Sequence, residues 1–155
     1  MKKLCLIIIM LTGCSAGSLR LDKRWLPLTH IVERNLPFIP DNVVTTIGTT
    51  AYISNLDEFL ENNQPGSPRF ESLMLHEQIH SIRQLNYGTT IWIINYMIYP
   101  SFRWEEERLG WEADIRFAKR HGIAKKDEQY ALILSEFYGN MITYDRALEW
   151  VRSIH

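Results

Sequence analysis

The segment PRFESLMLHEQIHSIRQLNYG, residues 68–88, decides how the rest of the chain is interpreted. The proline at its start and the glycine at its end predict one helix that runs to about Tyr87 and stops at Gly88. Apolar residues such as Leu73, Met74 and Ile79 surround the central HEQIH. We therefore expect this helix to lie in a core.

Three polar residues of this helix have the spacing of a metal site. His76 and His80 are four residues apart, so both imidazoles lie on one face and can bind one metal ion. Glu77 is placed to take a proton from a water molecule at the open coordination position. In a core, such a cluster is costly unless a metal ion or hydrogen bonds satisfy it. The alternative is a structural helix whose histidines cap neighbouring elements and whose glutamate pairs with an arginine.

The start of the chain has the features of an export signal. Lys2 and Lys3 precede an apolar run, residues 4–11, that is too short to span a bilayer. The residues Leu11-Thr12-Gly13-Cys14 resemble the lipobox of bacterial lipoproteins. That resemblance implies a signal peptide over residues 1–13, a lipid on Cys14 and a lipidated tether over residues 14–24. Ser15 would then favour outer-membrane delivery in a Gram-negative cell. A plain secretory signal with a chance cysteine is the alternative.

The cysteine count and the net charge limit which metal ligands and which binding partners we expect. The chain has 155 residues and only two cysteines, Cys5 in the signal and Cys14 at the lipidation site. No cysteine is then left for a disulfide, so zinc ligands would come from His, Asp and Glu. The 17 basic and 18 acidic residues give a net charge of −1, and no basic stripe predicts binding to nucleic acid.

The remaining sequence predicts an α+β fold, a mostly helical single domain over residues 25–155 with a small β element before the HEQIH helix. Residues 25–40 contain three prolines and are expected to be extended, with at most one short helical turn. β-branched runs on either side of Gly48 predict a hairpin or one bent strand. Residues 62–68 are predicted to form a loop. The predicted strands are residues 43–47 and 49–53, and the predicted later helices are residues 89–99, 101–120, 126–138 and 143–154.

A third metal ligand is expected from the helix over residues 101–120, because catalytic zinc usually has three protein ligands. Our first choice is Glu107, since Gly110 lies one turn away and lets this helix approach the histidines closely. Asp114 could accept a hydrogen bond from a ligating imidazole. Glu112, beside Ala113, is the second choice and Glu105 the third. The alternative for these glutamates and Glu106 is a solvated face paired with Arg103 and Arg108.

The HEQIHSIRQ segment, residues 76–84, resembles the HExxHxxQ helix of small gluzincin-like metallopeptidases, although Gln84 stands one residue later than the glutamine of that motif. Some of these proteins are bacterial or phage-type lipoproteins. Their later Glu-x-x-small-aromatic motif is matched by ERLGW, residues 107–111. The resemblance covers about residues 45–121 and implies a zincin-like fold. Residues 111–114, WEAD, are also similar to the ExxAD signature of membrane-associated gluzincins, but Gly110 stands at the ligand position of that signature.

The resemblance implies a membrane-anchored zinc metallopeptidase of the cell envelope. It would hydrolyse peptide amide bonds with a zinc-activated water, and Glu77 would be the general base. Tyr138, Tyr144 and His121 are candidate oxyanion donors, each of which has a structural alternative. Residues 49–53 are our candidate edge strand for binding an extended peptide.

Two other functions stay open at this stage. One is a non-catalytic envelope lipoprotein that uses a zincin-like fold, with or without the metal, to bind a partner. The other is an amidase that acts on peptidoglycan cross-links by the same zinc chemistry. The intact Glu77 favours catalysis, because a binding protein does not need a general base.

Overall fold

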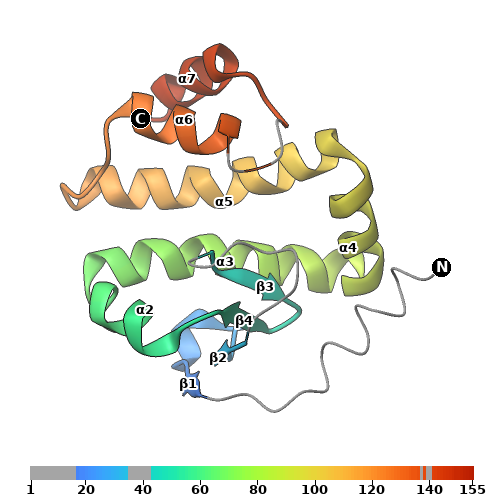
Figure 1. The fold of residues 1–155 in the computed structure, drawn as a ribbon, viewed down its shortest axis with the longest axis vertical. Helices are drawn as coiled ribbons and strands as arrows, with labels where there is room; N and C mark the ends of the chain where they lie inside the picture. Colours follow the sequence, from blue (N-terminus) through green and yellow to red (C-terminus); the bar gives the residue numbers. More distant parts are fainter. Residues whose placement is uncertain (1–16, 35–42, 137, 139–140) are drawn as a thin grey trace.

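Two long helices form the centre of the molecule, and the other elements cover their outer sides. The computed structural model describes residues 17–34, 43–136, 138 and 141–155. Helix α3 (Pro68–Tyr87) lies alongside α5 (Pro100–Arg120), and α4 (Thr89–Ile98) joins them at one end (Figure 1). A small sheet and α2 (Leu56–Asn62) cover α3, while α6 (Asp127–Glu136) and α7 (Tyr144–Ser153) cover α5 (Figure 1). The fold is thus α+β and mostly helical, as predicted.

The sheet has four short strands in the order β1-β2-β4-β3. They are β1 (Ser18–Arg20), β2 (His30–Glu33), β3 (Thr45–Ile47) and β4 (Thr50–Ile53). Strands β2 and β4 are parallel, and the other two pairs are antiparallel. Gly48 has a φ of 61° in the turn between β3 and β4, a conformation that favours glycine. The hairpin expected about Gly48 is therefore confirmed.

Three expectations for this region need correction. Strand β1 falls within residues 14–24, so the folded part begins by Ser18 and not at Trp25. The run that we expected at the edge, residues 49–53, is central, because β4 pairs with both β2 and β3. The edge strand next to α3 is β3. Helix α2, capped by the Asn55 side chain, was not expected at all. The predicted signal peptide and Cys14 lie outside the described residues.

Helix α3 forms where the sequence predicted it. The Ser67 hydroxyl accepts a hydrogen bond from the Phe70 N–H, Pro68 occupies the first turn, and Gly88 follows the last residue with a φ of 88°. Helices α4, α5, α6 and α7 also lie within two residues of their expected ends. Local signals were sufficient for the helices because caps and breakers are close in sequence to the ends that they determine.

Two separate apolar cores flank the pair of long helices. The first lies between α3, α2 and the sheet, and the second between α5, α6 and α7. The first contains Trp25, Leu28, Ile31, Ala51, Ile53, Leu56, Phe59, Phe70 and Met74, and the second contains Ile115, Tyr130, Ala131, Leu134, Ala147, Val151 and Ile154. Most of the buried polar side chains, including His76, Glu77, His80, Glu106 and Glu107, come from the two long helices between these cores.

Side chains of α3 hold the β3–β4 hairpin through hydrogen bonds to its backbone. The fully buried Gln84 donates to the Thr46 carbonyl at 2.7 Å and accepts from the Gly48 N–H at 2.8 Å. The Ser81 hydroxyl donates to the Gly48 carbonyl at 2.6 Å. Since β3 is an edge strand, these bonds fix its position on α3.

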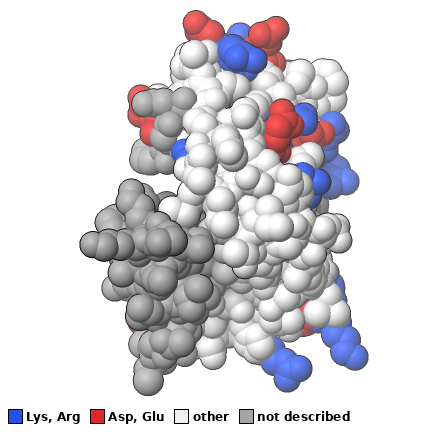
Figure 2. Space-filling model, turned by 90° about the vertical axis from the view of Figure 1, so that its right-hand side faces the viewer, with Lys and Arg blue, Asp and Glu red and all other residues white. Residues whose placement is uncertain are grey.

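One surface of the molecule is strongly apolar. Residues 84–102 contain no charged side chain, and α4 exposes Ile91, Met97 and Ile98. Figure 2 shows this side of the molecule with a broad uncharged area and charged side chains toward its upper and lower ends. Among the described residues, no helix has the length and apolar character needed to cross a membrane.

We predict that Gln84→Ala lowers the free energy of unfolding by about 2–3 kcal/mol, because two buried backbone groups lose their partner. Urea unfolding followed by circular dichroism measures this change. The control is Asn86→Ala, an exposed position near the end of the same helix, which should have little effect. Equal stability of the two variants would contradict the proposed role of Gln84.

Candidate metal centre

The histidines of α3 face α5 with their ring nitrogens close together. His76 Nε2 and His80 Nε2 are 3.0 Å apart, and both side chains are buried. The spacing of four residues places the two rings one turn apart on the same side of the helix. The structure therefore brings together the pair that the sequence predicted.

Glu107 of α5 completes the cluster from the opposite side. Its Oε2 is 3.5 Å from His76 Nε2, and its Oε1 is 3.6 Å from His80 Nε2. The three residues form a buried group in which one ligand atom from each lies within 4.8 Å of the others. Glu107 is thus the carboxylate that the structure places beside both histidines.

The other glutamates of α5 make ion pairs with arginines. Glu112 pairs with Arg116 at 2.9 Å and Glu105 with Arg108 at 2.9 Å, both on partly exposed positions. Glu106 is buried but binds Arg83 at 2.6 Å. Of these pairs, Glu105–Arg108 is the one that the charged-face alternative predicted, whereas Glu106 is buried and Arg103 donates to backbone carbonyls. Our second and third choices, Glu112 and Glu105, lie outside the cluster.

The donor set fits a metal ion. Ligand atoms about 2.0–2.1 Å from a tetrahedral zinc ion would lie about 3.3 Å from one another. His76 Nε2 lies 3.0 Å from His80 Nε2 and 3.5 Å from Glu107 Oε2, close to this value, while His80 Nε2 is 3.6 Å from the other oxygen, Oε1. Within the described part of the chain, Glu107 Oε2 has no hydrogen-bond partner although it is buried. His76, His80 and Glu107 could therefore hold a metal ion.

Gly110 is the reason that α5 can come this close. A Cβ atom at this position would lie 2.8 Å from both Cδ2 and Nε2 of His76. Real Cβ atoms almost never approach a neighbour so closely, so any other residue would displace the ring. The small residue that the sequence predicted near Glu107 is present, and its contact is with a candidate ligand.

The cluster is electrostatically coupled. Burial disfavours protonation of His76, but the adjacent Glu107 and the charges of Glu77 and Asp114 raise its pKa to about 8. Burial and the nearby His76 lower the pKa of His80 to about 4. Burial opposes ionisation of Glu107, yet the two imidazoles and Tyr96 lower its pKa. Because a metal ion needs the lone pair of each Nε2, its binding would displace a proton from this pair.

Glu77 lies beside the cluster and is held by the sheet. Its Oε2 accepts a hydrogen bond of 2.7 Å from the Thr46 hydroxyl of β3. Burial raises the pKa of Glu77 to about 7, although His76 and this hydrogen bond oppose the shift. A carboxylate with a pKa near neutrality is suited to taking up and returning a proton.

The structure also places the other site residues that the sequence suggested, namely Asp114 and the three candidate oxyanion donors. Asp114 influences His76 through its charge, but its carboxylate accepts a hydrogen bond from Ser72 of α3. The Tyr138 hydroxyl accepts a hydrogen bond of 3.2 Å from Trp111, whose ring contacts His76, and burial and the charge of Glu107 raise the pKa of Tyr138. Tyr144 is exposed, and His121 stacks on Phe117 at the far end of α5. Of the three oxyanion candidates, Tyr138 is the one near the cluster.

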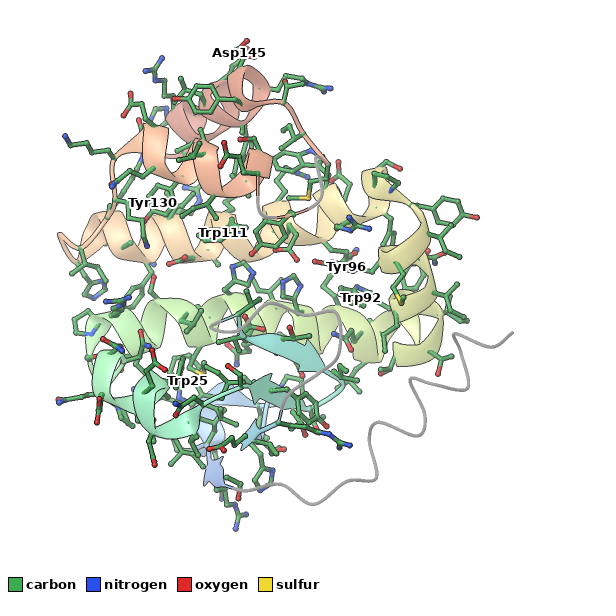
Figure 3. All side chains as sticks on the ribbon, viewed as in Figure 1. Trp25, Trp92, Tyr96, Trp111, Tyr130 and Asp145 are labelled. Atoms are coloured by element: carbon green, nitrogen blue, oxygen red, sulfur yellow. The ribbon has the colours of Figure 1, made fainter. Side chains whose placement is uncertain are left out.

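Sequence reasoning missed the aromatic wall around the imidazoles. Figure 3 shows Trp92 and Tyr96 of α4 on the side of that helix that faces α3 and α5. Trp111 contacts His76 edge-on at 5.1 Å, and Trp92 contacts His80 at 5.9 Å between ring centroids. The Tyr96 hydroxyl donates a hydrogen bond to Glu107 Oε1. The four-residue spacing of Trp92 and Tyr96 puts them on one face, but nothing local shows which helix that face meets.

Comparison of the chain with protein-family models, with curated proteins and with solved structures finds no match. Function has therefore to be inferred from the geometry and chemistry of the site itself.

We predict that Gly110→Ala lowers metal affinity by about tenfold or more, because the new methyl group displaces the His76 ring and misoriented ligands bind weakly. Competition with a chromophoric chelator measures the affinity. Alanine is a better helix former than glycine, so the metal-free variant should keep its helix content. Unchanged affinity would show that the ring can move without loss of the site.

Proposed function

We propose that the protein is a zinc-dependent metallopeptidase of the cell envelope, anchored to a membrane by a lipid on Cys14. The observation that carries the enzymatic part is the placement of Glu77 next to a buried His76–His80–Glu107 cluster. Three protein ligands with one open position are typical of catalytic zinc, whereas structural zinc usually has four. The donor set of two imidazoles and one carboxylate also suits zinc.

The chain supplies the groups that amide hydrolysis requires. Bound zinc lowers the pKa of water and polarises an amide carbonyl. Glu77 takes the proton of the attacking water and returns it to the leaving amine. Thr46 fixes the carboxylate of Glu77 in the position from which it does so. The hydroxyl of Tyr138 is the nearest of our candidates to stabilise the developing oxyanion.

The edge strand β3 supports a peptide as the substrate. No further strand of the described sheet pairs with its outer edge, although Gln84 of α3 already bonds to the Thr46 carbonyl, and the Thr46 hydroxyl contacts the general base. An extended peptide could pair with this edge through backbone hydrogen bonds. Its amide bonds would then pass close to Glu77.

The apolar surface of α4 supports the membrane location in this proposal. Its exposed isoleucines and Met97 would be unfavourable in water unless covered. The distance from Cys14 to Ser18 is four residues, about 14 Å when fully extended. A lipid on Cys14 would therefore hold the folded domain close to the bilayer.

We predict one zinc ion per chain, lost in His76→Ala, His80→Ala and Glu107→Ala, because each removes a ligand atom. Metal content of the purified protein by mass spectrometry tests this. The matched controls are Glu112→Ala on α5 and His121→Ala at its end, both outside the cluster. A protein that neither retains nor takes up zinc would exclude this proposal.

We predict that Glu77→Gln keeps zinc and lowers peptide hydrolysis about 10²- to 10⁴-fold, because the amide accepts the Thr46 hydrogen bond but cannot take up a proton. The rates are measured with a fluorogenic peptide library and with peptidoglycan cross-link peptides. If the wild type and Glu77→Gln both bound zinc but neither hydrolysed either substrate, the alternative of a partner-binding lipoprotein would be favoured. Hydrolysis of the cross-link peptides alone would favour the amidase.

We predict that Cys14 carries the lipid. Cells expressing the full chain and fed an alkyne analogue of palmitate should label the wild type and Cys5→Ala but not Cys14→Ala. The unlabelled variant should also shift from the membrane fraction to the soluble fraction. Equal labelling of all three chains would exclude this lipidation site.

A further inference from the structure

The carboxylate of Glu107 has two oxygens in different surroundings. Oε1 accepts a hydrogen bond from the hydroxyl of Tyr96 and lies 3.6 Å from His80 Nε2. Oε2 is buried, lies 3.5 Å from His76 Nε2, and has no hydrogen-bond partner in the described part of the chain. One oxygen thus has a hydrogen-bond donor, while the other, beside His76, has none among the described residues.

Tyr96 is itself held firmly by its neighbours. Its ring stacks on Trp92 with centroids 4.7 Å apart and an interplanar angle of 19°. The guanidinium of Arg103 lies over the Tyr96 ring, 5.5 Å from its centroid, and donates to the Tyr96 carbonyl at 3.1 Å. These contacts restrict the direction in which the hydroxyl can donate.

The Tyr96 hydroxyl lies on a mostly apolar helix whose other polar residues are Thr89, Thr90 and Asn95. Helix α4 (Thr89–Ile98) is otherwise rich in apolar side chains, and its buried Trp92 needs only an apolar neighbour for the stack. Phenylalanine would fill the same volume. The hydroxyl therefore serves the carboxylate, since Glu107 is its one hydrogen-bond partner among the described residues.

We propose that Tyr96 is a positioning residue that makes Glu107 a ligand through one oxygen only. Its hydroxyl retains Oε1, so Oε2, the oxygen beside His76, is the atom presented to the metal. Ligation through a single oxygen leaves a coordination position open, which a catalytic site requires. This inference depends on the metal binding in the proposed function, but not on hydrolysis.

The test compares Tyr96→Phe with the wild type in the full chain. The variant loses one oxygen atom and keeps the ring on Trp92. We expect zinc affinity to fall about 10- to 100-fold, as for other residues that orient ligands. With cobalt in place of zinc, the visible absorption bands should weaken, because a carboxylate released from Tyr96 binds through both oxygens and raises the coordination number. The matched control is Tyr99→Phe at the end of α4, where the side chain is 54% exposed and both readouts should be unchanged.

Three outcomes are distinguishable. The positioning role would be overturned if Tyr96→Phe bound zinc with wild-type affinity and had an unchanged cobalt spectrum. It would also be overturned if the variant only lost thermal stability in the metal-free state, with affinity and spectrum unchanged. A wild type that binds no metal would overturn both this inference and the proposed function. If the protein bound metal and Tyr96→Phe had the expected effect, but no peptide was hydrolysed, the inference would be supported. Only the proposed peptidase activity would then be contradicted.

Discussion

The contact between Gly110 of α5 and the imidazole of His76 on α3 is the constraint on which the centre of the molecule depends. The position of a Cβ atom would be 2.8 Å from the ring, so the two helices can be this close only because the side chain is absent. This close approach brings Glu107, one turn before Gly110, to both histidines. The glycine weakens the helix slightly, by roughly 1 kcal/mol relative to alanine. Metal binding by the cluster would offset this cost in helix stability.

The buried imidazoles and carboxylates lie between α3 and α5, outside the two apolar cores that stabilise the fold. One apolar core packs α3 on the sheet, and another packs α5 on α6 and α7. The layer between the two long helices therefore contains buried imidazoles and carboxylates that neither core needs. Burying such groups is unfavourable unless they are paired. Arg83 satisfies Glu106, and Ser72 bonds to Asp114, whereas Glu107 Oε2 is left without a hydrogen bond in the part of the chain described.

The sequence predicted the features that are determined locally. Ser67, Pro68 and Gly88 set the ends of α3, and the HEQIH spacing put both histidines on one face. Glu107 was preferred over Glu112 because Gly110 is one turn away, and the structure places Glu107, not Glu112, at the cluster. Features that depend on distant pairing were missed. Strand β1 is short and pairs with a segment twelve residues later, and Tyr96 acquires its role only because α4 turns back onto α5.

Helix α3 connects the candidate metal cluster to the edge of the sheet through two neighbouring rows of side chains. One row, with His76 and His80, faces α5. The other begins with Phe70 and Met74 in the apolar core and continues with Glu77, Ser81 and Gln84, which all bond to the β3–β4 hairpin. A single rigid helix thus fixes the distance between the ligands, the proposed general base and the edge strand β3. A peptide paired with β3 would have its register relative to the cluster set by these bonds, so loss of the hairpin contacts should disturb the binding of substrate before the binding of metal.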